Sequence, residues 1–440
     1  MNSQLPMQRV AITWVNHCGA ALVKVVPFST FDSAVQIGVG FSPVADAFCA
    51  DGSVDASHSL ARPDDDLRLR ADPKGLAWLE PSTGWAWAPG QRWQRSGEPY
   101  AADQRNFCAQ QQQLLHSANI TLMAGFELEW LVAGRSEDGS FLPAVLGGPY
   151  GADRLIEGLD YATAILNAFD AAGLPWLQFH PEYGSGQFEF SFSHTTAVEA
   201  ADRLVHAKLL IQRVSNRFGL RCSFSPKPLL GQVGNGGHLH LSLQQADTHW
   251  LQGGAGIGEL QPQGEAFIAA LLNHLPALLA LACPLAVSYL RLAPSSWSAP
   301  FQVWGVENRE AALRLIPTAA DGVSAHLELK VADLAANPYL LLGAVQAVAW
   351  QAIQQPAKPL PAAVVGDPAL LPDGLAKRLP INLTEASAAF AASELLQKSM
   401  GLLLHSSLVD SQKAEIKRCA HLCDEQLVVS SRWWPVVGAI

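Results

Sequence analysis

The 440-residue chain has little charge: only 15% of its residues are Asp, Glu, Lys or Arg. Its formal net charge of −10 at pH 7 argues against a general surface for nucleic acid or anionic membranes, because neither would meet a basic face. Any anionic substrate must be bound by a few local cations. The hydrophobic fraction of 49% predicts extensive buried surface, in the core or between subunits.

The sequence also lacks the signals of export or membrane insertion. Residues 1–10 do not combine a basic start with an apolar stretch. The longest apolar stretch, residues 267–290, contains two prolines and runs into Arg291, which predicts a buried core helix. The seven cysteines are odd in number and scattered, as is typical of free thiols in a reducing compartment. We therefore expect a cytoplasmic protein with no membrane partner.

The length of the chain allows two domains. Residues 8–103 have the pattern of irregular β-structure, with strands at 10–15 and 20–26 and with loops over 62–98. The rest of the chain carries helical patterns, at residues 106–118, 155–172, 197–218, 267–287, 335–354 and 385–404. We predict an α+β fold with a small domain at residues 1–104 and a larger one at 105–440, whose sheet is backed by helices.

One alternating stretch organises the larger domain. Residues 234–243 read Gly-Asn-Gly-Gly-His-Leu-His-Leu-Ser-Leu. In a strand, His238, His240 and Ser242 would share one face and the leucines the other. Taken alone, an amphipathic strand whose histidines meet solvent explains the pattern equally well. The same alternation recurs, however, at Glu127 and Glu129 and at Glu328 and Lys330.

Six of the polar side chains in such segments form a hard, oxygen-rich ligand set: Glu127, Glu129, Glu182, Glu189, His238 and Glu328. Such a set favours two or three Mg²⁺ or Mn²⁺ ions over a tetrahedral zinc. Carboxylates in apolar surroundings are costly unless a cation neutralises them, and metal ions would do so.

Four basic residues lie in an otherwise apolar part of the chain: Arg291, Arg309, Arg314 and Lys330. Guanidinium groups match carboxylate and phosphate oxygens, and divalent ions that bridge phosphates complete a phosphoryl-transfer site. For any single arginine, pairing with a nearby structural acid is the simpler interpretation.

Six motifs occur along the chain in one order. They are Glu-x-Glu, two glutamates with Gly-Gln between them, Gly-x-Gly-x-His-x-His-x-Ser-Leu, Arg-Leu-x-Pro, Asn-Arg-x-x-x-x-Arg and Glu-x-basic-x-x-x-Asp-x-x-x-Asn-Pro-Tyr. Together they resemble the catalytic domain of glutamine synthetase over residues 105–440. The resemblance implies an antiparallel sheet backed by helices, preceded by a β-grasp-like domain, and ATP as co-substrate.

The resemblance also implies a role for each matching position. Glu129, Glu182 and Glu189 match the ligands of one metal, and Glu127, His238 and Glu328 match those of the metal that holds the ATP phosphates. Gly234, Arg291 and Lys330 match the glutamate-binding positions. Arg309 and Arg314 match the residues that meet the transferring phosphoryl group and the nucleotide phosphates, and His240 and Ser242 match positions beside the nucleotide. Arg309 and Glu328 are expected to be catalytic.

One position departs from the family pattern. Glutamine synthetases carry a glutamate after the Arg-Leu-x-Pro turn, where it binds and deprotonates ammonium, but this chain has Trp297. An indole cannot accept a proton, although it offers an apolar wall and a cation–π face to a larger amine. We therefore place Trp297 in an amine pocket.

The resemblance implies a ligase that joins the γ-carboxylate of L-glutamate to an amine through γ-glutamyl phosphate, and Trp297 favours a primary organic amine. The amine could be ethanolamine, an alkylamine, a polyamine or an arylamine. A glutamine synthetase that uses ammonia is one alternative, and a non-catalytic, nucleotide-binding regulatory protein is another. The resemblance further implies a homo-oligomer of stacked rings with active sites between subunits.

Overall fold

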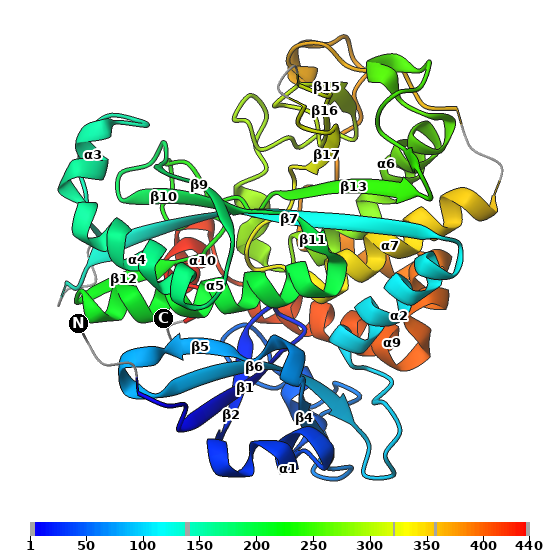
Figure 1. Cartoon of the computed structure of the whole chain (residues 1–440). Helices are drawn as coiled ribbons and strands as arrows, with labels where there is room; N and C mark the ends of the chain where they lie inside the picture. The colour runs from blue at the N-terminus through cyan, green and yellow to red at the C-terminus, as the bar shows by residue number, and fades with distance from the viewer. Residues whose placement is uncertain (1–4, 137–140, 320–321, 356–358, 437–440) are drawn as a thin grey trace.

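The protein is described from a computed structural model over residues 5–136, 141–319, 322–355 and 359–436. Two β-sheets organise these residues, and helices lie between them (Figure 1). The first sheet is built from residues 9–93 and the second from residues 120–329. The predicted α+β class is confirmed.

The first sheet corrects one prediction. Its strands are β1 (Arg9–Val15), β2 (Ala21–Pro27), β3 (Val39–Phe41), β4 (Leu67–Ala71), β5 (Ala77–Glu80) and β6 (Trp85–Trp93). Residues 62–98, predicted as loops, therefore hold three strands. Their alanine, proline and glycine content hid the pattern, yet β6 is a central strand where small residues are needed: a Cβ on Gly90 would lie 2.6 Å from Leu69 Cδ1.

The second sheet is long and mainly antiparallel. Its strands are β7 (Ile120–Gly134), β8 (Leu142–Pro143), β9 (Trp176–Pro181), β10 (Gln187–Phe192), β11 (Thr195–Thr196), β12 (Leu220–Ser223), β13 (Leu239–Gln245), β14 (Thr248–His249), β15 (Trp304–Val306), β16 (Leu313–Ile316) and β17 (His326–Leu329). The main path runs β15-β16-β17-β13-β7-β10-β9, and among the described strands of this sheet only β15 and β16 pair in parallel. This order brings distant glutamate-bearing segments next to one another.

The helices lie close to the predicted positions. They are α1 (Phe31–Gln36), α2 (Gln104–Ser117), α3 (Ala152–Glu157), α4 (Leu159–Ala171), α5 (Ala197–Arg217), α6 (Pro262–Ala282), α7 (Pro338–Gln354), α8 (Leu383–Ala391), α9 (Glu394–Cys419) and α10 (Asp424–Ser431). The single helix predicted at 155–172 is instead two helices, α3 and α4, divided at Gly158. The single helix predicted at 385–404 is also two helices, because the Ser393 side chain accepts a hydrogen bond from Leu396 N and caps a new helix.

A buried charge network joins the first sheet to the helix layer. Asp103 caps α2 by accepting a hydrogen bond from Asn106 N, and its other carboxylate oxygen accepts from Arg92 Nε at 3.0 Å. Arg92, on β6, is fully buried and also pairs with Asp46 at 2.6 Å. The predicted domain boundary between residues 104 and 105 falls at the start of α2 and stays a prediction.

Strand β7 shows why the second sheet has a polar face. Phe126, Leu128 and Trp130 are almost fully buried, and Trp130 Nε1 donates to Tyr161 on α4 in the helix layer. The alternating residues, which include the two glutamates of the first motif, lie on the opposite face of the strand. The sheet therefore buries one face under helices and leaves the other for a site.

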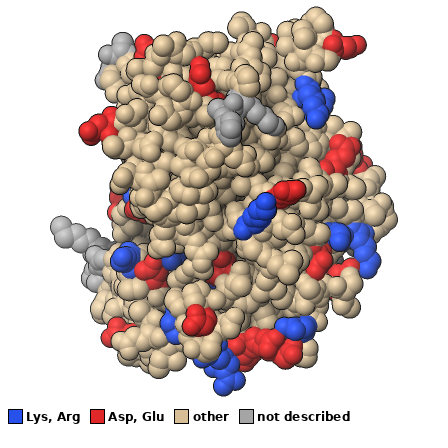
Figure 2. Space-filling view, turned by 90° about the vertical axis from the view of Figure 1, so that its right-hand side faces the viewer, with Lys and Arg blue, Asp and Glu red and all other residues tan. Residues whose placement is uncertain are grey.

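The most apolar helix belongs to the core. Helix α6 has the length and composition of a membrane span, but 67% of its most apolar window is buried inside the protein. It is a core helix, as the sequence predicts. Figure 2 shows one side of the molecule, on which uncharged side chains predominate and charges of both signs gather toward the end that holds the first sheet.

Candidate active site

One cluster of carboxylates forms where β9, β10 and β7 lie side by side. Strand register places Glu189 opposite both Glu129 and His180, and Glu182 follows directly after β9. His180 Nε2 lies 3.5 Å from Glu182 Oε1 and 3.9 Å from Glu189 Oε1. We call Glu129, Glu182, Glu189 and His180 the acidic group.

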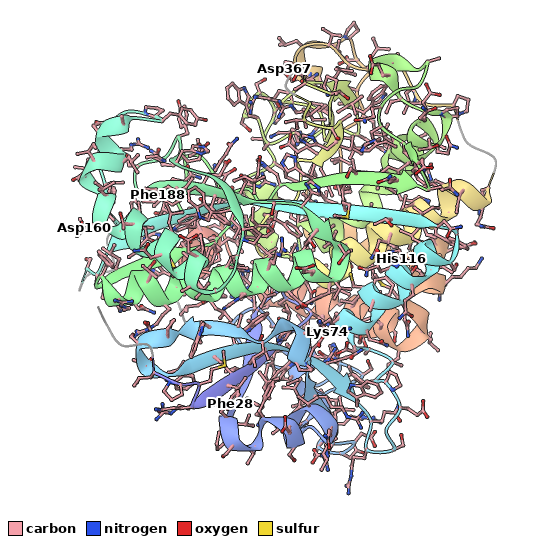
Figure 3. All side chains as sticks on the ribbon, viewed as in Figure 1. Phe28, Lys74, His116, Asp160, Phe188 and Asp367 are labelled. Carbon is pink, nitrogen blue, oxygen red and sulfur yellow. The ribbon has the colours of Figure 1, made fainter. Side chains whose placement is uncertain are left out.

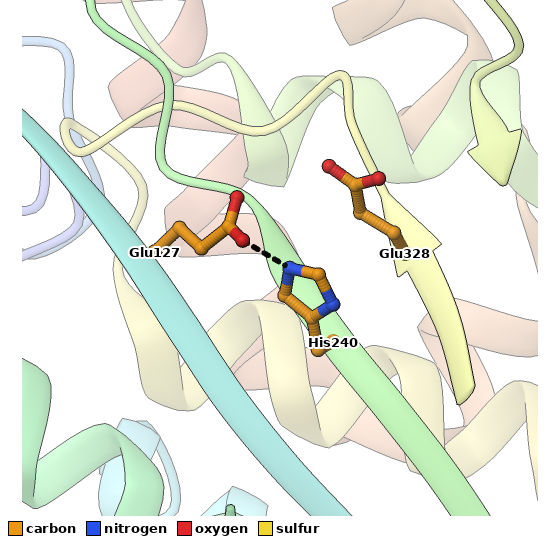
Figure 4. A group of neighbouring side chains, drawn as sticks. All are labelled: Glu127, His240 and Glu328. Carbon is orange, nitrogen blue, oxygen red and sulfur yellow. Dashed lines mark ion pairs between the residues drawn. The ribbon is translucent and has the colours of Figure 1, made fainter. Parts of the chain in front are cut away.

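A second cluster spans β7, β13, β17 and β16. His240 faces Glu328 across the β13–β17 pair, and Arg314 faces Glu328 from β16. Figure 4 shows Glu127 and His240 facing each other from β7 and β13, with Glu328 on β17 beside them. We call this cluster the balanced group, and its members are Glu127, His238, His240, Arg314, Glu328 and Lys330.

Short contacts hold the balanced group together. Glu127 is 3.0 Å from His238 Nδ1 and 3.1 Å from His240 Nε2. Glu328 is 3.1 Å from Arg314 Nη1 and 3.3 Å from Lys330 Nζ. Every carboxylate in this group thus has a basic partner from the chain itself.

His238 joins the two groups. Strand β13 begins only at Leu239, so His238 precedes the strand in which it was predicted to lie. Its Nδ1 is 3.4 Å from Glu328, and its Nε2 is 3.7 Å from Glu129 Oε1. Close approach requires glycine nearby, because a Cβ on Gly236 would lie 2.4 Å from His238 Nε2.

Burial has opposite outcomes in the two groups. In the acidic group, burial raises the pKa of Glu189 well above its usual range, and repulsion from Glu127, Glu129 and Glu182 adds to the rise. Burial likewise raises the pKa of Glu129, where the attraction of His238 is not enough to reverse it. These carboxylates therefore lack sufficient positive charge.

In the balanced group, basic partners outweigh burial. Burial alone would raise the pKa of Glu328, but Lys330, His238 and His240 lower it to about 2. Burial also opposes ionisation of Glu127, whose pKa is nevertheless held well below its usual range by the hydrogen bond with His238 and the ion pair with His240. Both carboxylates are stabilised as anions.

The donor atoms fit divalent metals. Ligand atoms lie within 4.8 Å of one another in two sets: Glu127, His240 and Glu328, and His180, Glu182 and Glu189. Carboxylate oxygens with one imidazole are donors that Mg²⁺ or Mn²⁺ accepts, and the raised pKa values of the acidic group indicate that a cation would relieve its repulsion.

Sequence reasoning missed His180. The sequence contained a signal for this residue. His180 stands two residues before Glu182, and alternate positions in an extended segment share a face. Ser242 lies further along β13, opposite Met123, and no contact joins it to either group in the described part of the chain.

The structure brings Gly234 and Arg291 together. Arg291 is buried, and its Nη2 donates to the carbonyl oxygens of Val331 and Ala332. Its Nε has no hydrogen-bond partner among the described residues. A Cβ on Gly234 would lie 2.7 Å from Arg291 Cγ, so glycine is required there. This leaves a buried guanidinium with donor capacity for a carboxylate ligand.

Trp297 and Arg309 line a separate cleft of about 540 Å³. Arg309 is exposed, whereas Arg314 lies in the balanced group. Trp297 is 61% exposed, and its backbone is in the left-handed region at φ 57°. Its backbone N–H donates to Glu310 Oε1 at 2.6 Å, which fixes the loop that presents the indole.

A family model described as glutamine synthetase, catalytic domain, matches residues 101–427. The chain therefore belongs to the glutamine synthetase family. The enzyme class predicted from the motifs, an ATP-dependent ligase, is confirmed.

Curated relatives and solved structures agree with this assignment. Gamma-glutamylpolyamine synthetase GlnA3 of Streptomyces coelicolor is 41% identical over 438 residues, 96% of this chain and 93% of that protein. The glutamine synthetase of Pyrococcus horikoshii is 30% identical over 76% of this chain and 72% of its own length.

Two solved structures show the same fold. A novel glutamine synthase homolog superposes with a TM-score of 0.85 at 27% identity, covering 97% of this chain and 98% of its own. GmaS in complex with ADP superposes with a TM-score of 0.83 at 26% identity, covering 95% of each chain. The predicted glutamine synthetase-type fold is confirmed.

Proposed function

We propose that the chain joins the γ-carboxylate of L-glutamate to a primary amine of a polyamine, with ATP as the source of energy. The observation that carries the choice of an organic amine is Trp297, whose exposed indole lines a cleft together with Arg309. The name of the relative with 41% identity, a gamma-glutamylpolyamine synthetase, supports a polyamine as the amine.

The reaction has two steps. A γ-carboxylate oxygen of glutamate attacks the γ-phosphorus of ATP, and ADP leaves. The amine nitrogen then attacks the γ-carbonyl carbon, phosphate leaves, and the nitrogen loses one proton. Charge that develops on the transferring phosphoryl group must be met by fixed cations.

We assign the anion-binding steps to the arginines. Arg309, exposed in the Trp297 cleft, meets the transferring phosphoryl group, and Arg314 meets the nucleotide phosphates. His240 and Ser242 keep their predicted positions beside the nucleotide. Arg291, with Gly234 packed against it, binds the α-carboxylate of glutamate through its unpartnered Nε. Lys330 completes the glutamate site while it neutralises Glu328.

The carboxylates would hold more than one Mg²⁺ or Mn²⁺ ion. Glu129, Glu182, Glu189 and His180 would surround one ion, and Glu127, Glu328 and the histidines His238 and His240 another. Bound divalent ions neutralise phosphate oxygens and orient the nucleotide. Glu328 also orients Arg314 through their 3.1 Å ion pair, which is our reason to count it with Arg309 among the catalytic residues.

Synthesis of glutamine from ammonia is the competing function. It is supported by the name of the 30% identical relative, a glutamine synthetase. We also propose that the chain works in the cytoplasm as stacked rings with active sites between subunits, as the family resemblance implies. Mass photometry of the purified protein tests the assembly, and a monomer would contradict it.

The function is tested by ADP release from ATP, Mg²⁺ and L-glutamate with ammonium or a panel of amines, with the products identified by mass. We expect release that depends on a polyamine and yields its γ-glutamylamide. Release with ammonium alone would establish glutamine synthesis instead, and no release with any amine would favour a regulatory protein.

A further inference from the structure

The cleft beside Trp297 is acidic in a way that the phosphoryl-transfer chemistry does not explain. Its lining contains three carboxylates, Glu307, Glu310 and Asp367, against one basic residue, Arg309. None of the three forms an ion pair with a basic side chain in the described part of the chain. Figure 3 shows Asp367 beside the far end of the second sheet, away from the first sheet.

Glu310 is the most unusual of these acids. It is only 7% exposed, and its Oε1 accepts the hydrogen bond from Trp297 N. Its Oε2 is buried and has no hydrogen-bond partner among the described residues. Burial raises the pKa of Glu310, the bond from Trp297 N opposes the rise, and Asp367 adds to it. A buried acceptor that receives no hydrogen bond lowers the stability of the folded protein unless a ligand supplies the donor.

Asp367 supports the same wall from the other side. Its Oδ2 accepts a hydrogen bond from Ser295 Oγ at 2.6 Å, and its Oδ1 accepts from Ala369 N at 2.8 Å. Ser295 and Trp297 both have a positive φ, so the two acids hold a loop whose backbone is rarely adopted by residues other than glycine. The carboxylates of Glu310 and Asp367 are therefore held in place by hydrogen bonds.

Size and charge together define the occupant. A cleft of about 540 Å³ is far larger than the roughly 30 Å³ that a water-sized molecule such as ammonia occupies. Carboxylates match ammonium groups, and an indole packs against aliphatic carbon and attracts a cation by its face. The natural ligand is a linear aliphatic chain with more than one ammonium group.

We propose that this cleft binds a second ammonium group of the amine substrate, with Glu310, Glu307 and Asp367 as its anionic wall and Trp297 as the surface for the carbon chain. The inference rests on the proposed glutamate–amine ligase function. It adds a selection rule: the enzyme distinguishes a diamine from a monoamine of the same length by the charge on the distal end.

Putrescine and butylamine test this rule, because they share a chain length and differ in the second ammonium group. We expect the wild type to have a kcat/KM for putrescine at least about tenfold above that for butylamine, as one desolvated charge pair can supply. Glu310→Gln keeps an acceptor for Trp297 N but removes the charge, so the putrescine-to-butylamine ratio should fall about tenfold. Asp367→Asn should lower the same ratio less.

A matched control is Glu394→Gln, which removes one charge from an 85% exposed side chain on α9 and should leave the ratio unchanged. If Glu310→Gln lowers kcat/KM for both amines equally, the acids only hold the loop and the inference is overturned. A rise in the KM of L-glutamate with an unchanged putrescine-to-butylamine ratio would also overturn the inference, because the acids would then contribute to glutamate binding.

Calorimetric titration of putrescine separates this inference from the proposed function. Should the wild type ligate no amine, the proposed function fails, and the cleft is still supported if putrescine binds and Glu310→Gln weakens that binding. Should the wild type ligate butylamine as well as putrescine, the function stands and the second-ammonium site is overturned.

Discussion

The acidic group and the balanced group lie next to each other on one sheet face, yet they meet the cost of buried charge differently. In the balanced group, Glu328 is 2% exposed but has Arg314 at 3.1 Å and Lys330 at 3.3 Å. In the acidic group, burial and mutual repulsion raise the pKa of Glu129 and of Glu189. The chain supplies the counter-charge of one group and leaves that of the other to a bound cation.

This difference predicts which substitutions destabilise the folded protein. Removing a carboxylate from the balanced group leaves buried cations without a partner, which is strongly destabilising. Removing one from the acidic group relieves repulsion when no metal is bound. Both changes should lower turnover strongly, so stability in a chelator is the measurement that separates them.

The largest effect is expected for Glu328→Ala. This variant leaves Lys330, which is 4% exposed, without its ion pair and removes a partner of Arg314. We expect a loss of about 3 kcal/mol in the free energy of unfolding, measured by denaturant titration in EDTA. Turnover should fall by at least about a hundredfold.

The control for this prediction is Glu394→Ala, whose carboxylate is exposed and pairs with Lys398 at 3.6 Å. It should change the free energy of unfolding by less than about 0.5 kcal/mol. An unchanged stability of Glu328→Ala would show that solvent or another anion compensates Lys330, and the two groups would no longer differ.

Glu189→Gln is expected to have a smaller effect on stability and of the opposite sign. In EDTA the variant should be about 1 kcal/mol more stable than the wild type, because a repulsive carboxylate becomes neutral without a change of shape. Its turnover should fall about a hundredfold, since one proposed metal ligand is lost. Denaturant titration at pH 8 and the ADP-release assay measure the two quantities.

Magnesium should reverse that order of stability. At a hundred times its dissociation constant, a bound ion stabilises the folded state by about 2.7 kcal/mol. The wild type should gain this stability on addition of Mg²⁺, and Glu189→Gln should gain less than half. Equal gains in both proteins would place the stabilising ion outside the acidic group.

The site residues that sequence could locate are those on regular strands. Glu127 and Glu129 alternate with core residues along β7, and this alternation alone dictates that they share the free face. Strand register then brings Glu189 to Glu129 and Glu328 to His240, which no local pattern encodes. The motif order supplied these pairings through the family resemblance, whereas their catalytic roles stay predictions.

The features of the site that sequence reasoning could not predict depend on irregular backbone. The hydrogen bond from Trp297 N to Glu310 requires a positive φ at Trp297. Residues other than glycine rarely adopt a positive φ, and no propensity rule predicts it at this position. Strand β6 was missed for another reason, since its small residues are selected by close packing between neighbouring strands and not by strand propensity.

The smallest predicted effect concerns His180, the basic side chain that lies nearest to Glu182 and Glu189. If it helps to hold the cation of the acidic group, His180→Asn should raise the Mg²⁺ concentration for half-maximal turnover roughly tenfold. Stability should change by less than about 0.5 kcal/mol, because the side chain is 35% exposed.

Two further variants make the outcome for His180 decisive. His180→Asp restores a hard oxygen donor and should recover part of the Mg²⁺ affinity. His116→Asn, an exposed histidine on α2 that Figure 3 places away from the sheet face, should have no effect. An unchanged Mg²⁺ requirement in His180→Asn would mean that the three carboxylates alone bind the cation. The contrast between the two groups would then be sharper, because the acidic group would have no basic side chain of functional importance.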